Sequence, residues 1–231
     1  MDLNLGLTLN QASPPKVLFN KLGLVMWLRA DKGYRVDNTI PAWDDQNGGV
    51  AFAELAFGNN PTFVANSING MPALTFDQTS MVFPLNVNLS DASTTFIVFK
   101  HTDLAKGTLL WQTPNGFNLY IENNFVRTGY SGNGLTSTAT AITPSTPTIL
   151  TALRPVQAGG TIFFLNGVAS PAGATRPLFS SGSDLWIGTE DATPSNTYTG
   201  DIAEIIVFSR TLTASRRFEV ENYLKSKYSI A

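Results

Sequence analysis

Aromatic and amide side chains gather in one stretch of the sequence, where Trp111 and Gln112 precede Asn118 and Tyr120. Sugars present apolar CH patches beside hydroxyl groups, so a sugar site needs aromatic rings next to amides or carboxylates. This mixture predicts a carbohydrate-binding site, while packing of Trp111 in a core is the competing interpretation. The predicted site consists of Trp111, Gln112, Asn115, Asn118, Tyr120 and Tyr130.

The carboxylates do not form the pattern of a glycan hydrolase. A retaining glycosidase holds two carboxyl groups about 5–5.5 Å apart, commonly on one strand with a spacing of two residues. None of the six glutamates begins such a run, and Glu219 and Glu221 fall in a helical pattern that turns them apart. We therefore expect no enzyme. A hydrolase or lyase whose carboxylates come from distant strands is an alternative.

Two other titratable residues have structural interpretations. Glu204 lies in an otherwise apolar strand pattern, and pairing with Arg29, Arg210 or a backbone amide is favoured over a functional carboxylate with a shifted pKa. His101 is the single histidine, so neither a catalytic triad nor a histidine-rich metal site is expected.

Oxygen ligands for a metal are dense at two places, residues 44–47 and residues 190–191. Calcium needs several such ligands, but the first cluster falls in a turn, where Asp side chains commonly cap backbone amides. No cysteine is present, which removes thiolate ligands and disulfides. We predict no metal and no cofactor, with calcium as the alternative.

Short strands must position these residues. Turn signals such as Asn69-Gly70 and Asn166-Gly167 recur between runs of apolar and β-branched residues, and residues 94–100 contain a continuous apolar run typical of an inner strand. Strands are predicted over residues 22–29, 73–76, 94–100, 107–112, 118–121, 125–128, 147–153, 161–165, 184–187 and 201–208.

One helix is predicted, at the C-terminal end. Thr213 can cap it, and Phe218, Val220, Tyr223 and Leu224 supply its apolar surface. The pattern predicts an all-β, two-sheet antiparallel jelly-roll sandwich with one C-terminal α-helix. We expect one domain over residues 21–231, preceded by an extended arm over residues 1–20.

The arm shows its own alternation, with apolar residues at every second position from Leu3 to Leu9, and Pro14-Pro15 ends the pattern. It fits an extra strand of the same sandwich as well as an edge strand added to a neighbouring protein. The attachment residues of this predicted arm are Leu3, Leu5, Leu7 and Leu9.

Charge and hydropathy exclude two classes of partner. The net charge is −2 and the basic residues are scattered, which gives no electrostatic basis for nucleic-acid binding. No apolar run approaches the length of a membrane span, so no membrane partner is expected. The first residues lack the basic and apolar regions of a signal peptide, which predicts synthesis in a cytoplasm.

Five segments in order carry a family resemblance. They are residues 26–48 (MWLRAD…AWDDQNG), 61–64 (PTFV), 68–77 (INGMPALTFD), 163–167 (FFLNG) and 200–210 with the following helix (GDIAEIIVFSR). Together they resemble the bacterial and phage branch of the concanavalin A-like, laminin G-like superfamily. Gln78 stands where the family usually has glycine, which implies a different turn, and Arg216 replaces the acidic residue of a capping box.

The resemblance implies architecture more than activity, because this fold carries many functions. We expect a non-catalytic binding protein at a bacteriophage virion surface, in the capsid decoration or the tail, made in the host cytoplasm. Its expected partners are other virion proteins through the arm, further copies of itself as a homo-oligomer, and cell-surface glycans. A stand-alone, extracellular lectin-like module is the first alternative.

Overall fold

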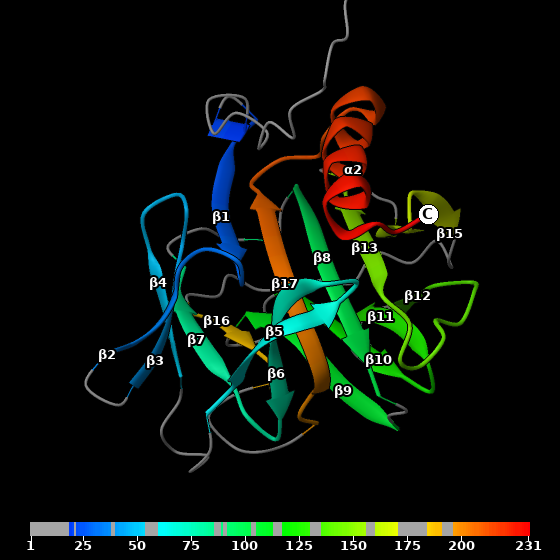
Figure 1. Ribbon diagram of the computed structural model, residues 1–231. Helices are drawn as coiled ribbons and strands as arrows, with labels where there is room; N and C mark the ends of the chain where they lie inside the picture. The colour runs from blue at the N-terminus through cyan, green and yellow to red at the C-terminus, as the bar shows by residue number, and fades with distance from the viewer. Residues whose placement is uncertain are drawn as a thin grey trace, which may run out of the picture.

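The protein is an all-β sandwich of two antiparallel sheets with one long helix packed on the outside, as a computed structural model shows (Figure 1). The structure describes residues 19–20, 22–37, 40–53, 60–85, 89, 92–102, 105–112, 117–129, 135–155, 160–170, 184–190 and 196–231. The fold class predicted from the sequence is thereby confirmed. Leu3, Leu5, Leu7 and Leu9 lie outside the described residues.

The eight-stranded sheet is built around its last strand. Its order is β15-β14-β13-β8-β17-β6-β5, and β1 also pairs with β17. One edge of β17 pairs with β8, while the other edge is shared by β6 over Thr199–Ile202 and by β1 over Glu204–Phe208. The strands are β1 Leu24–Arg29, β5 Thr62–Ile68, β6 Met71–Asp77, β8 Ser93–His101, β13 Thr148–Arg154, β14 Ile162–Leu165, β15 Val168–Ser170 and β17 Thr199–Phe208.

The nine-stranded sheet lies against it, in the order β12-β11-β10-β9-β16-β7-β4-β3-β2. Most neighbours in this order are also neighbours in the chain and form hairpins, whereas β16 enters between β9 and β7. The strands are β2 Tyr34–Asp37, β3 Ile40–Asp44, β4 Val50–Ala53, β7 Met81–Pro84, β9 Lys106–Gln112, β10 Asn118–Glu122, β11 Phe125–Gly129, β12 Leu135–Ser137 and β16 Asp184–Ile187.

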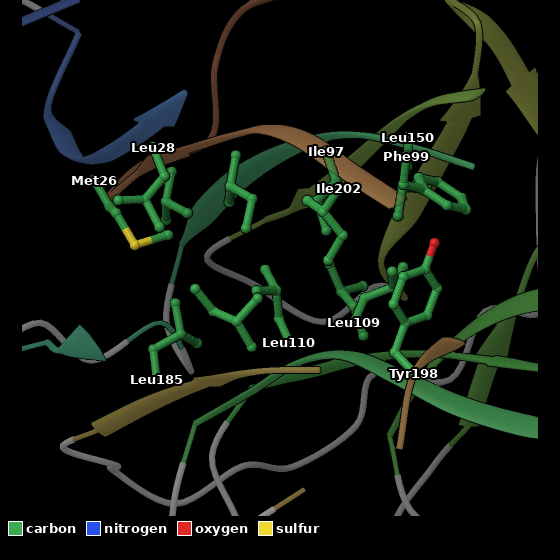
Figure 2. Close-up of a cluster of buried hydrophobic side chains, with 14 of the residues drawn as sticks. Met26, Leu28, Ile97, Phe99, Leu109, Leu110, Leu150, Leu185, Tyr198 and Ile202 are labelled. Atoms are coloured by element: carbon green, nitrogen blue, oxygen red, sulfur yellow. The ribbon is translucent and has the colours of Figure 1, made fainter. Parts of the chain in front are cut away.

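The main hydrophobic core fills the space between the two sheets (Figure 2). Ile97 and Ile202 reach it from the eight-stranded sheet, and Leu110 and Leu185 reach it from the nine-stranded sheet; all four are fully buried. Successive residues of a strand point to opposite faces, so these core residues identify the faces of their strands.

A second core lies under the helix α2, which spans Ala214–Tyr228. Val220 and Leu224 pack with Ile206 and Phe208 on the outer face of the eight-stranded sheet. The strands β8 and β17 are therefore buried on both faces, which explains the continuous apolar run predicted to be an inner strand. Phe19 joins this core, with its ring centroid 5.1 Å from that of Trp27.

The helix begins as predicted but exposes one residue that was expected to be buried. Thr213 is the N-cap, and its side chain accepts a hydrogen bond from the backbone N–H of Arg216 at 3.4 Å. Phe218 was predicted to supply apolar surface, yet it is 56% exposed. The prediction was wrong there because Val220, Glu221, Leu224 and Tyr228 define the buried side.

The turn after β6 has a non-glycine residue, Gln78, in a backbone conformation that favours glycine. Gln78 has a φ of 53°, the left-handed conformation that glycine adopts without steric cost. The backbone therefore holds the Gln78 side chain in a conformation that favours glycine. The turn difference from the family, which the replacement of glycine by Gln78 implies, remains a prediction.

Within the part of the chain that the structure describes, no helix combines the length and the hydropathy needed to cross a membrane.

Candidate functional site

The outer face of the nine-stranded sheet carries two tryptophans side by side. Trp186 on β16 is the register partner of Trp111 on β9. Leu185 and Ile187 belong to the core, so strand alternation places Trp186 on the opposite, outer face, and Trp111 beside it. Trp186 is 9% exposed and Trp111 is half-buried. This tryptophan pair forms an apolar surface that is partly open to solvent.

Polar groups surround the next aromatic ring on the same face, Tyr120 of β10. The Lys106 ammonium lies 5.0 Å from the centre of this ring and forms an ion pair with Glu190, Nζ to Oε1, at 2.9 Å. The Asn196 amide donates to the same Glu190 oxygen at 2.9 Å. Lys106, Glu190 and Asn196 come from three separate segments, which meet beside Tyr120.

A second ion pair lies on the other side of Tyr120. Arg127 of β11 is the register partner of Tyr120, and its Nη1 is 2.7 Å from Oε2 of Glu122. Burial raises the pKa of the Tyr120 hydroxyl, and the nearby carboxylates add to the rise while Arg127 opposes it. Tyr120 therefore remains a neutral hydrogen-bonding group at physiological pH. We call the tryptophan pair together with Lys106, Tyr120, Glu122, Arg127, Glu190 and Asn196 the aromatic face.

Two of the amides predicted for the site have structural roles instead. Gln112 is the register partner of the core residue Leu185, and its Oε1 accepts the Leu89 N–H at 3.0 Å. Asn118 accepts the Gly129 N–H at 2.7 Å. Both are fully buried, which removes them from the predicted ligand surface and corrects that part of the prediction.

Of the other predicted site residues, Trp111 and Tyr120 lie on the aromatic face, and Asn115 and Tyr130 fall outside the described residues. The sequence prediction missed Glu190 and Asn196 because they are distant in the chain from Tyr120. It also missed Lys106, Glu122 and Arg127, although these are near Trp111 and Tyr120 in sequence. Trp186 was not among the predicted site residues. Its position between two apolar residues on a strand was the signal that could have placed it on the outer face.

Glu204 is the centre of a buried polar network rather than the partner of an arginine. Its Oε1 accepts from Trp27 Nε1 at 2.6 Å, and its Oε2 accepts from Tyr228 at 2.8 Å and pairs with Lys227 at 2.7 Å. Of the predicted partners, Arg29 is the register partner of Glu204 and interacts with its charge, but its ion pair is with Asp31. Arg210 forms no ion pair with Glu204 among the described residues, and α2 supplies the donors at this point of β17 instead. Tyr223 donates to Glu204 as well, at 3.0 Å.

This network extends to the surface through Asp31. Lys227 Nζ is 2.8 Å from Asp31, and Arg29 is 2.6 Å from it. Burial alone would raise the pKa of Asp31, but the hydrogen bonds and charges of Arg29 and Lys227 outweigh it and lower that pKa. Burial and the charge of Glu204 raise the pKa of Tyr223 and of Tyr228. The arrangement ties β1, β17 and α2 together.

A third polar cluster, around Asp201, brings a serine close to a lysine. Ser67 donates to Asp201 at 2.5 Å, and Lys100 Nζ lies 2.9 Å from the same carboxylate and 3.4 Å from the Ser67 oxygen. Burial would raise the pKa of Asp201, but hydrogen bonds from Ser67, Thr75 and Lys100 lower it. A carboxylate with a lowered pKa is a weak base, so the cluster is poorly suited to activate Ser67.

The candidate metal ligands also have other partners. Asp45 accepts backbone N–H groups from Trp27 at 2.6 Å and from Asn47 at 2.9 Å, which confirms the predicted capping of amides in this turn. His101 is buried, with Nε2 3.0 Å from the side-chain oxygen of Asn124. Among the residues that the structure describes, His, Asp and Glu form no group of three arranged to hold a metal ion.

Known proteins resemble this chain in structure but not in sequence. No protein-family model and no curated protein matches it. The receptor-binding domain of botulinum neurotoxin type G has a TM-score of 0.62 at 13% identity, over 87% of this chain and 51% of that chain. A structure of botulinum neurotoxin type C, whose cell entry depends on interaction with two ganglioside molecules, has a TM-score of 0.62 at 11% identity, over 90% of this chain and 53% of that chain.

A sialidase from Trypanosoma rangeli in complex with sialic acid has a TM-score of 0.62 at 15% identity, over 89% of this chain and 33% of that chain. The chain thus spans about half, or less, of the structures that it resembles. At these identities the likeness shows the fold, an all-β sandwich, and leaves the site to be argued from its own residues.

Proposed function

We propose that the protein is a non-catalytic carbohydrate-binding sandwich of the laminin G-like kind, which binds glycans at the aromatic face. The observation that carries this proposal is the pairing of Trp111 with Trp186 beside Tyr120 and the polar groups of Glu190 and Asn196. Aromatic rings stack on the apolar side of a sugar, and carboxylate and amide groups bind its hydroxyls.

The structural neighbours support glycan binding as the general role. The neurotoxin type C structure is described by its interaction with ganglioside molecules, and the sialidase structure contains sialic acid. The saturated hydrogen bonding of Glu204 and Asp201 supports a role without catalysis, because each carboxylate is already occupied by donors of the fold. Turnover of polysaccharides, measured as new reducing ends, would contradict this part of the proposal.

A glycan array tests the binding itself. The wild-type chain is expected to give saturable binding that Trp111→Ala removes, because the substitution deletes half of the tryptophan pair. Phe218→Ala is the matched control, since it deletes an aromatic ring that is 56% exposed on α2, outside the aromatic face. Binding that survives Trp111→Ala, or that Phe218→Ala removes equally, would contradict the proposed site.

We further propose that the sandwich is displayed on a bacteriophage virion, attached to a neighbouring protein or to another copy through the predicted arm, residues 1–20, up to Phe19, which packs in the second core. This placement is supported by the laminin G-like sequence segments and by the alternating leucines of the predicted arm. The test is the mass of the full chain in solution, compared with a chain that begins at residue 19. An assembly that dissociates on truncation is expected, and a monomeric full chain would contradict attachment between copies.

A further inference from the structure

The charged residues of the aromatic face are balanced against each other, and this balance bears on which glycans the face accepts. We infer that the ligand is an electrically neutral glycan, and that a sialic acid or sulfate on the same glycan weakens binding. This inference rests on the proposed function and specifies the substrate class of the proposed site.

Each cation described on the face already has a carboxylate partner. Lys106 is paired with Glu190 at 2.9 Å, and Arg127 with Glu122 at 2.7 Å. On its other side, the Lys106 ammonium rests on the Tyr120 ring, at 5.0 Å. The face therefore presents two positive and two negative groups, and it offers no concentration of positive charge to an anion.

An anionic sugar would have to share these cations with the carboxylates. Its carboxylate or sulfate would approach Lys106 or Arg127 within a few ångströms of Glu190 or Glu122, and like charges at that distance repel. The anion could avoid this repulsion only by displacing a carboxylate from its cation. The new ion pair would then gain little over the one that is lost, because such pairs are worth at most about 1 kcal/mol, equivalent to a factor of about five in affinity.

A neutral sugar avoids this conflict. Its hydroxyls can donate to the carboxylate oxygens of Glu122 and Glu190, whose side chains are 33% and 17% exposed. Hydrogen bonds to ionised acceptors are the stronger kind, and they leave both ion pairs in place. The tryptophan pair meanwhile contacts the CH surface, which neutral and charged hexoses share.

The experiment compares glycans that differ only in charge, on an array and then by titration calorimetry. Lactose and sialyllactose are one such pair, and other neutral oligosaccharides are matched with their sialylated or sulfated forms. The wild-type chain is expected to bind the neutral member about fivefold more tightly, with little change in affinity between about 0.05 M and about 0.5 M NaCl.

A charge variant adds a gain of function. Glu190→Gln keeps the size of the side chain and leaves Lys106 without its carboxylate. The variant is expected to shift the ratio of sialylated to neutral binding by about fivefold toward the sialylated glycan, and this gained binding should weaken with salt. Glu219→Gln is the control, because it removes the same charge from the Arg216–Glu219 pair on α2.

The outcomes separate the inference from the function on which it rests. Wild-type binding that favours the sialylated member and weakens steeply with salt overturns the inference and leaves glycan binding intact. A Glu190→Gln variant with unchanged preference also overturns it. If no glycan binds at all, the proposed function fails, and the inference fails with it.

Discussion

The outer faces of the two sheets differ in what covers them. On the eight-stranded sheet, α2 covers β8, β13 and β17, adds a second hydrophobic core and is held by the buried Glu204 network. The aromatic face of the nine-stranded sheet instead keeps Trp111 partly exposed beside paired charges. One outer face thus carries a second core that stabilises the fold, and the other carries the site that we propose for glycans.

The largest effect that this comparison predicts is at Glu204. Glu204→Ala leaves the Lys227 ammonium and three donors buried without their acceptor, and we expect a loss of about 3–5 kcal/mol in the free energy of unfolding. Denaturant unfolding measures it, and Glu219→Ala at the exposed end of α2 should cost under about 0.5 kcal/mol. If Glu204→Ala lowered the free energy of unfolding as little as Glu219→Ala does, the Glu204 network would not be what holds α2 on the sheet.

Leu224→Ala tests the second core without touching any charge. Leu224 is fully buried between α2 and the eight-stranded sheet. The cavity should cost about 3 kcal/mol in unfolding free energy, within the usual range for leucine. Glycan binding by the folded variant should be unchanged, because the aromatic face is on the other sheet. Loss of both together would show that the two faces are not independent.

Trp111→Ala is the counterpart on the aromatic face. Since Trp111 is only half-buried, its removal should lower the free energy of unfolding by about 1–2 kcal/mol, which is less than the cost at Leu224. Binding on the glycan array should nevertheless disappear. A stability loss larger than that of Leu224→Ala would assign Trp111 to the core and restore the competing interpretation of this residue.

Acid should loosen the helix-covered side. The pKa of Asp31 is lowered from its ordinary value of 3.8. The contribution of Asp31 to the free energy of unfolding is therefore present above pH 3.8 and is lost as the pH falls through the lowered pKa of the folded state. We expect wild-type stability to fall between about pH 5 and about pH 3, and Asp31→Asn to remove about 1 kcal/mol of that dependence. Unfolding curves across this range measure it; an unchanged slope in the variant would contradict the assignment.

The smallest expected effect is at Gln78, in the turn that leads from β6 in one sheet toward β7 in the other. Gln78→Gly relieves the left-handed strain, and the gain is reduced by the greater freedom of glycine in the unfolded chain. We expect a net stabilisation of about 0.5 kcal/mol, measured by denaturant unfolding. Ser229→Gly at the C-cap of α2, also at positive φ, is the comparison on the helix-covered side and should give a similar gain. Destabilisation by Gln78→Gly would show that the side chain contributes more than the strain costs.

Much of the fold could be predicted because strands with apolar runs are recognisable in the sequence. All ten predicted strands coincide with observed ones, and the cap at Thr213 was correct. The strands β2, β3 and β4 are among those that were missed, since they are short and carry no long apolar run. The burial of Phe218 was predicted wrongly because helical periodicity alone does not say which side meets the sheet.

The candidate site was harder to predict, for a geometric reason. Trp111 and Gln112 are consecutive in a strand and so point to opposite faces, which the period of two already implied. Lys106 and Glu190 come from segments far apart in the chain, and no local pattern brings them together. The same holds for Glu204 and Lys227, which meet only when α2 docks.

The position of β17 has a consequence for how the chain is made. This strand is the common neighbour of β1, β6 and β8, yet it follows all three of them in the chain. β1 cannot pair until β17 has been synthesised. Contacts this distant in sequence slow folding, and they leave the edges of β6 and β8 unpaired on a growing chain. Completion of the eight-stranded sheet therefore waits for the synthesis of β17.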